Sequence, residues 1–146
     1  MIGKLNFNQF VHDFYQILSQ FDQSVSNLGL NKIQQELIKI RASQINKCGF
    51  CLNIHIKKAI KYGENPKRIH TLSAWREEQN LFTTEEQIIL ALTEELTTIS
   101  NQGLSSEIYN SAVHTFGNEK TAKIILAVAN INGWNRITKS FYLQLF

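Results

Sequence analysis

The sequence predicts an all-α protein of about seven helices, organised as a single domain that spans residues 1–146. Two observations predict this fold class. Apolar residues recur at the i, i+3, i+4 and i+7 spacing of amphipathic helices, and no useful length of sequence alternates apolar and polar residues as a strand does. The length and the 43% hydrophobic content are sufficient for a substantial buried core.

The first two helices are predicted from periodicity and from a capping signal. Asn31 and Gln34 form a capping box that begins the second helix, which continues to Ile45 and ends at Asn46 or Lys47. The first helix is amphipathic, because its large apolar residues follow the helical repeat. These residues are Phe7, Phe10, Val11, Phe14, Ile17, Leu18 and Phe21.

The third and fourth helices are separated by a glycine. The third helix is expected to open at the two cysteines, to run to Tyr62 and to be closed by Gly63, a residue that readily adopts the left-handed conformation after a helix. Pro66 fits the first turn of a short fourth helix, because its φ angle is already helical. The apolar residues of that fourth helix are Ile69, Leu72 and Trp75.

The remaining residues predict three more helices. A capping box at residues 83–86 precedes an apolar fifth helix that reaches about Ile99 and is broken by residues 101–103. A sixth helix begins at about Ser105, and a last helix continues toward residue 146. Gly117 is expected to separate these two helices.

Composition excludes several classes of partner. The net charge of +3 is mild, and the basic cluster has no interleaved aromatic residues to act as stacking platforms, so we expect a solvated face and no nucleic-acid partner. This basic cluster consists of Lys57, Lys58, Lys61, Lys67 and Arg68. No apolar run approaches the roughly 20 residues of a membrane span, and residues 1–6 lack a leader pattern. We therefore expect a cytoplasmic protein without a membrane partner.

The segment that carries chemistry holds both cysteines of the chain. Cys48 and Cys51 lie three residues apart, and His55 follows four residues after the second cysteine. On a helix these positions share one face, within about two turns. Two thiols and an imidazole on one face suit thiol–disulfide chemistry, and a lone cysteine pair in a cytosolic setting is more often catalytic or metal-binding than a structural disulfide.

A relay through Glu36 would activate this pair. A free thiol has a pKa of about 8.5, and a helix N-terminus alone is too weak to lower it by the roughly two units that a reactive thiolate needs. His55, one turn after Cys51, can take the thiol proton, and Glu36 can orient His55. Cys51 is then the attacking thiol and Cys48 the resolving one.

Plainer interpretations of the same residues stay open at this point. The cysteine pair could bind a metal or form two inert core thiols, although Cys48, Cys51 and His55 give zinc only three ligands. Glu36 could be an ordinary surface residue. His70 and His114 stand alone and are expected on the surface or in a satisfied core position.

Residues 36–55, ELIKIRASQINKCGFCLNIH, resemble the core of the AhpD-like, carboxymuconolactone decarboxylase superfamily. The similarity extends over roughly residues 30–140. It includes the Leu72-Ser-Ala-Trp75-Arg76-Glu77 segment, the Phe82-Thr-Thr-Glu85-Glu86 segment and the Asn132-Gly-Trp134-Asn135-Arg136 segment. The Glu36…Cys48-x-x-Cys51-x-x-x-His55 spacing, with its Ser-Gln-Ile-Asn lead-in, is much more specific than a cysteine pair alone.

The resemblance implies a helical fold that forms homo-oligomers, commonly trimers or hexamers, and a peroxidase that needs no cofactor or metal. It implies that Cys51 attacks the peroxide, Cys48 resolves, and His55 and Glu36 relay the proton. The expected partners are an organic hydroperoxide or hydrogen peroxide and an external dithiol reductant of the lipoyl or thioredoxin type. One departure is Phe50, which stands where the best-known members have a second histidine.

Two rival functions follow from the same residues. One is a decarboxylase or isomerase that uses His55 and Glu36 as acid and base, although the lactone decarboxylases of the superfamily lack the cysteine pair. The other is a non-enzymatic oligomer that senses redox state or holds zinc. The sequence names neither the peroxide nor the electron donor.

Overall fold

The computed structural model describes residues 12–27 and 29–141, and within these residues it contains helices and no strand. The described α-helices are α2 (His12–Ser26), α3 (Lys32–Ile45), α4 (Gly49–Lys61), α5 (Pro66–Thr71), α6 (Thr84–Thr97), α7 (Ile99–Gln102) and α8 (Ser106–Ser140). Two short 3₁₀ turns, Leu72–Ala74 and Gln79–Leu81, connect α5 to α6. The expected all-α class is confirmed.

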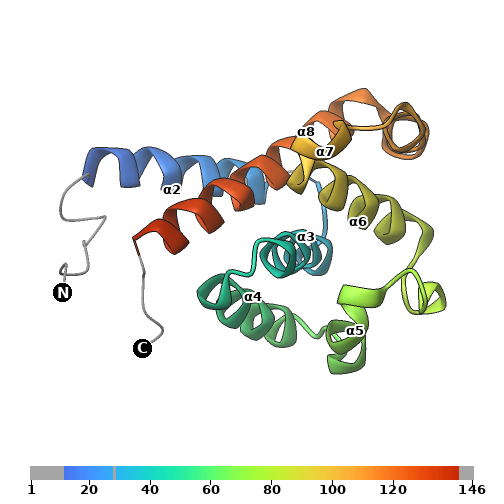
Figure 1. The fold of residues 1–146 in the computed structure, drawn as a ribbon, viewed down its shortest axis with the longest axis horizontal. Coiled ribbons are helices and arrows are strands. Elements are labelled where there is room, and N and C mark those ends of the chain that lie inside the picture. Colours follow the sequence, from blue (N-terminus) through green and yellow to red (C-terminus); the bar gives the residue numbers. More distant parts are fainter. Residues whose placement is uncertain (1–11, 28, 142–146) are drawn as a thin grey trace.

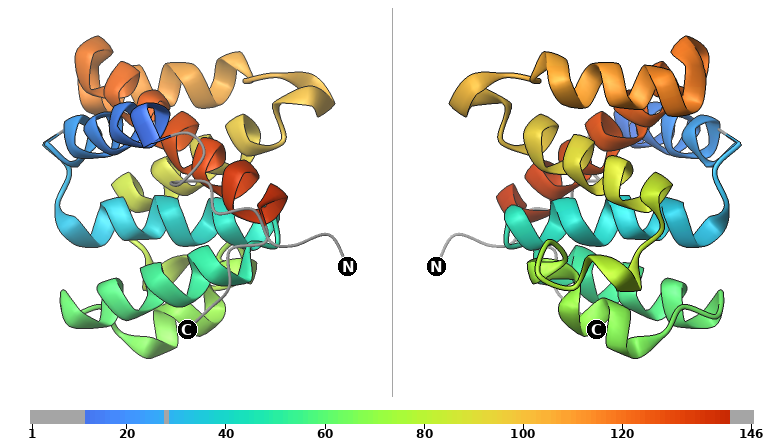
Figure 2. Two further views of the ribbon diagram at one scale, coloured as in Figure 1. Left: turned by 90° about the vertical axis from the view of Figure 1, so that its left-hand side faces the viewer. Right: turned by 90° about the vertical axis from the view of Figure 1, so that its right-hand side faces the viewer.

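Helix α3 lies at the centre of the described structure and packs against α4, α6 and α8 (Figure 1). Helices α2 and α8 lie together on one side of α3, while α4 and α5 lie on the other (Figure 2). Helices α3 and α4 run in opposite directions and are joined by a turn of three residues, 46–48. This helical hairpin carries every predicted site residue.

Most of the buried apolar side chains form two clusters, and α3 contributes to both because it is covered on several sides. Ile38 and Ala42 face the cluster built with α2, α6 and α8, whereas Leu37 and Ile40 face the cluster built with α4, α5 and the first 3₁₀ turn. Neighbouring residues of one helix therefore enter different clusters. The backbone of α3 is fixed between them.

The predicted helix ends agree closely with the structure where the signal is local. The side chains of Asn31 and Thr83 both accept hydrogen bonds in complete capping boxes, at the start of α3 and α6. Gly63 follows α4 with a φ of 94°. Gly117 interrupts the helical backbone of α8 with a φ of 77°, so α8 consists of two helical segments that meet at a kink, as predicted.

The fifth helix was predicted incorrectly at its end. Helix α6 ends at Thr97, and residues 101 and 102, which were expected to break the helix, belong to the separate turn α7. The break itself comes at Gly103, where φ is 76°. The start of the first predicted helix, including Phe7 and Phe10, lies outside the described residues, as does the chain after residue 141.

None of the helices in the described ranges combines the length and hydropathy that a bilayer span requires.

Candidate functional site

The two cysteines lie at the start of α4. Cys48 is the residue before the helix and Cys51 lies in its first turn. They form a disulfide in the structure, with their Cα atoms 5.4 Å apart. Both are buried, at 1% and 4% exposure. The helix start thus places the two sulfur atoms in bonding contact, as a redox pair requires.

Glu36 and His55 are joined across the α3–α4 hairpin. The Nδ1 atom of His55 lies 2.8 Å from Oε2 of Glu36. An ionised carboxylate only accepts hydrogen bonds, so Nδ1 carries the proton and donates it. In the neutral imidazole, Nε2 is then the nitrogen free to accept a proton. The second oxygen of Glu36 accepts from Lys39 at 3.4 Å.

The carboxyl group of Glu36 is buried, at 3% exposure, and it is nevertheless favoured in its ionised form. Burial raises its pKa. The hydrogen bond from His55 and the positive charges of Lys39, His55 and Lys58 outweigh that effect and bring the pKa below its ordinary value. Glu36, ionised at neutral pH, accepts from Nδ1 of His55 and so holds the imidazole in one tautomer.

A cavity of about 350 Å³ opens beside the cysteine pair. Cys51 and His55 both line it, whereas Cys48 does not. The other walls are mostly apolar and come from α2, α4 and α8; they are Tyr15, Asp22, Phe50, Ile54, Lys58, Trp134 and Thr138. A small molecule in this cavity would meet Cys51 and His55 together.

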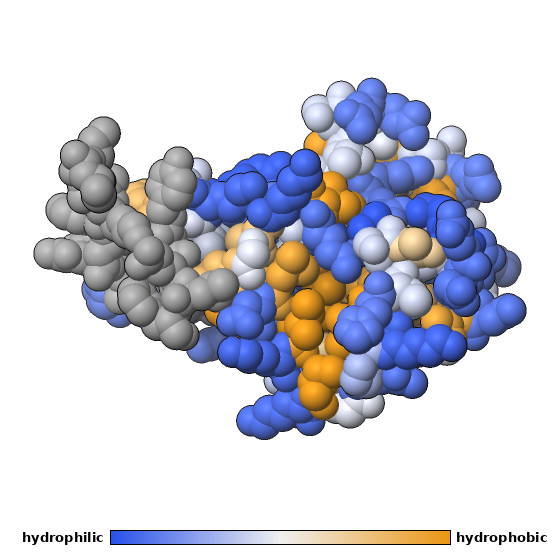
Figure 3. All heavy atoms as spheres, turned by 60° about the horizontal axis from the view of Figure 1, so that its bottom comes forward, coloured by the Kyte–Doolittle hydropathy of each residue, from blue (hydrophilic) through white to orange (hydrophobic). Residues whose placement is uncertain are grey.

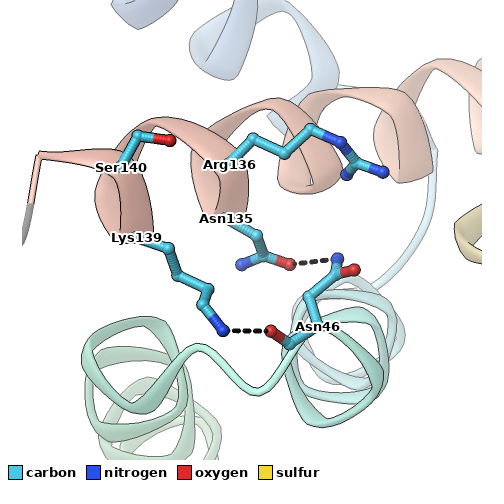
Figure 4. A pocket seen from close by; sticks show the side chains of 5 residues that line it. All are labelled: Asn46, Asn135, Arg136, Lys139 and Ser140. Atoms are coloured by element: carbon cyan, nitrogen blue, oxygen red, sulfur yellow. Dashed lines mark hydrogen bonds between the residues drawn. The ribbon is translucent and has the colours of Figure 1, made fainter.

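The turn before Cys48 is held by the last helix. The amide of Asn46 donates to Asn135 at 2.9 Å, and the ammonium of Lys139 donates to the carbonyl of Asn46 (Figure 4). The same amide donates to Asn132 at 2.9 Å, and Lys139 donates also to the carbonyl of Lys47. Lys47 has a φ of 53°, an unusual value for a residue with a side chain. These bonds stabilise the turn that positions Cys48.

The structure brings together all four predicted site residues. Glu36 contacts His55, the cysteines contact each other, and Cys51 and His55 line one cavity. His70 and His114 are exposed and lie outside this site. Within the described residues, no group of three or more His, Cys, Asp or Glu side chains is arranged to hold a metal ion.

Sequence reasoning missed several neighbours of the site. Lys39 is one of them, although its i+3 position from Glu36 is a common ion-pair spacing on helices. Lys58 is exposed, as expected for a solvated face, but it also follows His55 by three residues and lines the same cavity. Asp22 and Trp134 reach the site from distant elements, and no local pattern indicates such contacts.

Comparisons with known proteins agree on the family. Residues 12–94 match the carboxymuconolactone decarboxylase family, which is more than half of the chain. The chain is 31% identical over 138 residues to YdfG of Bacillus subtilis (strain 168), an uncharacterized protein; the match covers 94% of this chain and 93% of YdfG.

A solved structure is also similar over nearly the whole chain. It is that of ATU0492 from Agrobacterium tumefaciens, a protein of unknown function provisionally described as the antioxidant defence protein AhpD. The TM-score is 0.91 and the identity 30%, and the similarity covers 97% of this chain and 96% of ATU0492.

Proposed function

This chain belongs to the carboxymuconolactone decarboxylase family, and on that premise we propose that it is a thiol-dependent peroxidase of the AhpD type. The observation that carries the proposal is the cavity that brings Cys51 and His55 together, with His55 held by an ionised Glu36 and Cys51 bonded to Cys48. This set contains a nucleophile, a base, an orienting carboxylate and a resolving thiol.

The reaction begins with the reduced pair. Nε2 of His55 takes the proton of Cys51, and the thiolate attacks the terminal oxygen of the peroxide. The O–O bond breaks, the alkoxide leaves with the proton from His55 as an alcohol, and Cys51 becomes a sulfenic acid. The imidazolium formed in between is stabilised by Glu36.

Cys48 completes the cycle. Its sulfur attacks the sulfenic acid sulfur of Cys51, water leaves, and the disulfide seen in the structure forms. An external dithiol of the lipoyl or thioredoxin type then reduces the disulfide by exchange and is itself oxidised. The net reaction converts one hydroperoxide and one dithiol into an alcohol, water and a disulfide. A cytoplasmic location, where thiols are kept reduced, fits this chemistry.

A homo-oligomer, a trimer or hexamer, is part of the proposal. Helix α2 exposes Phe14 and Ile17, at 66% and 61%, and of its residues only Val25 is buried. An apolar band also crosses the face that carries α4 (Figure 3). Contiguous exposed apolar surface of this kind commonly marks a contact between chains. Light scattering should give a multiple of 16.8 kDa at micromolar concentration, and a monomer would contradict this part of the proposal.

The experiment that tests the function follows the thiols and the peroxide together. Reduced protein is mixed with one equivalent of an organic hydroperoxide, and peroxide loss is compared with the appearance of the Cys48–Cys51 disulfide by peptide mapping. Equal amounts of each support the proposal. Peroxide loss without a disulfide, or no peroxide loss from fully reduced protein, would overturn it.

A further inference from the structure

The cavity beside Cys51 meets a second cavity of different character. The second has a volume of about 340 Å³, and its walls are mainly polar. Asp22 and Lys58 line both cavities, so the two meet at these side chains. The Glu36–His55 pair lies between them, because His55 lines the first cavity and Glu36 the second.

The two cavities follow one face of α4. Cys51, His55 and Lys58 are spaced by four and three residues and therefore lie along one side of the helix. Seven residues of α-helix separate Cys51 from Lys58, which is about 10 Å along the helix axis. The face thus begins at the reactive sulfur and ends at an ammonium group.

The second cavity is lined by more positive than negative side chains. Lys32, Lys39 and Lys58 line the second cavity together with Asp22 and Glu36. Both acids are already engaged, since Glu36 accepts from His55 and Lys39 and Asp22 accepts from Asn130. Lys32 lies over the ring of Tyr62. Within the described residues, Lys58 has neither a hydrogen-bond nor an ion-pair partner, so its ammonium is available to a ligand.

We infer that the site takes an amphipathic hydroperoxide with an apolar chain and a carboxylate about 10 Å from the peroxide, and that Lys58 binds this carboxylate. This inference rests on the proposed peroxidase function and names its substrate class. The apolar walls near Phe50, Ile54 and Trp134 accept the hydrocarbon, and the peroxide lies at Cys51. The product is the hydroxy acid, and the oxygen lost from the peroxide leaves as water when Cys48 resolves.

The kinetic test compares a straight-chain fatty acid hydroperoxide, with the peroxide near the middle of the chain, and its methyl ester. The full-length protein with a dithiol reductant should prefer the acid by about tenfold in kcat/KM, through KM, because a charge-assisted hydrogen bond is lost in the ester. Lys58→Gln should remove this preference, so that the acid and the ester are consumed with equal kcat/KM. Lys57→Gln is the matched control, since Lys57 is exposed on the same helix and lines neither cavity.

A binding test needs no turnover. Decanoate and decanol are titrated into the disulfide form, and the fluorescence of Trp134 is followed, with Trp134→Phe to identify its signal. Decanoate should bind about tenfold more tightly than decanol, and Lys58→Gln should equalise the two. The difference should shrink with added salt.

The outcomes separate the inference from the proposed function. Equal binding of decanoate and decanol, or equal kcat/KM for acid and ester, overturns the inference while the peroxidase function stands. Preferential binding of decanoate that depends on Lys58, in a protein that consumes no peroxide, supports the ligand class and overturns the peroxidase function.

Discussion

Glu36, on helix α3, and Glu94, on helix α6, are two carboxylates whose partners differ in kind. Glu36 is bound by His55, which can gain and lose a proton, and by Lys39. Glu94 accepts from Arg41 at 2.8 Å and from the indole of Trp75 at 2.9 Å, and its other oxygen accepts from Arg76. Arginine keeps its charge at every pH that the protein experiences.

The pKa of both carboxyl groups lies below its ordinary value, for related reasons. For each, burial raises the pKa and hydrogen bonds with positive charge lower it by more. For Glu94 the donors are Arg76, Trp75 and Arg41, which join α3, α6 and the segment after α5. A lowered pKa alone therefore does not identify a functional carboxylate. What distinguishes Glu36 is its partner His55, which can gain and lose a proton and lines a cavity together with Cys51.

The largest effect should come from the cysteines beside Glu36. Cys51→Ser should abolish peroxide consumption, because serine supplies no thiolate at neutral pH. Cys48→Ser should keep the first turnover and lose the rest, since the sulfenic acid has no resolving thiol. Stopped-flow peroxide assays measure both. Retained catalysis in Cys51→Ser would favour the rival decarboxylase or isomerase chemistry of His55 and Glu36.

The second effect is on the rate at which Cys51 attacks peroxide, which should depend on Glu36 and not on Glu94. His55→Ala should slow the attack of Cys51 on peroxide by about 100-fold, within the range of general-base catalysis, and Glu36→Gln should slow it less. Thiolate absorbance against pH should show the pKa of Cys51 rising toward about 8.5 in His55→Ala. Glu94→Gln is the control and should change neither quantity. A thiol pKa that is the same in all three variants would mean that the relay does not act on Cys51.

Local signals in the sequence were sufficient to predict most of the fold and the two pairs of the candidate site, Glu36 with His55 and Cys48 with Cys51. The capping boxes at Asn31 and Thr83 involve residues three apart, so the sequence displays both partners together. The Glu36–His55 contact spans 19 residues, and the helical hairpin between them made it predictable once the family resemblance indicated both residues. The cysteine disulfide follows from a spacing of one helical turn.

Contacts between distant elements were not predictable from these patterns. Arg41 meets Glu94 across 53 residues, and Asn46 meets Asn135 across 89. Such pairs depend on how α3, α6 and α8 cross, which side-chain packing decides. The end of α6 was missed for a related reason, because no Gly or Pro marks Thr98, where the helix gives way to α7.

The third effect concerns stability, which the substitution of Glu94 should lower more than the substitution of Glu36. Glu94→Gln should lower the free energy of unfolding by about 2 kcal/mol, because two arginines lose a charged acceptor that joins three segments. Glu36→Gln should cost about 1 kcal/mol, because its charged partners are a single lysine and a histidine. Urea unfolding of both variants measures this. A larger loss for Glu36→Gln would mean that the Glu36–His55 pair contributes more to stability than the contacts of Glu94 do.

The smallest effect is the response of stability to acid. The folded-state pKa of Glu36 lies below 4.5, so as the pH falls the unfolded chain binds this proton first. The stabilisation is therefore complete well above pH 4.5 and is lost as the pH falls toward the lower, folded-state value. One carboxyl group can change stability by no more than about 1.4 kcal/mol per pH unit.

His55→Ala should therefore flatten this acid dependence, because Glu36 loses the hydrogen bond that most strongly lowers its pKa. The contribution of Glu94 should remain in that variant, since His55 is not among its partners. Urea midpoints between pH 3 and pH 6 would show the difference, with Glu77→Gln, an exposed change, as the control. If the dependence of stability on pH is unchanged in His55→Ala, Lys39 and Lys58 alone keep Glu36 ionised. Glu36 would then orient the imidazole of His55, although the imidazole does not lower the pKa of Glu36.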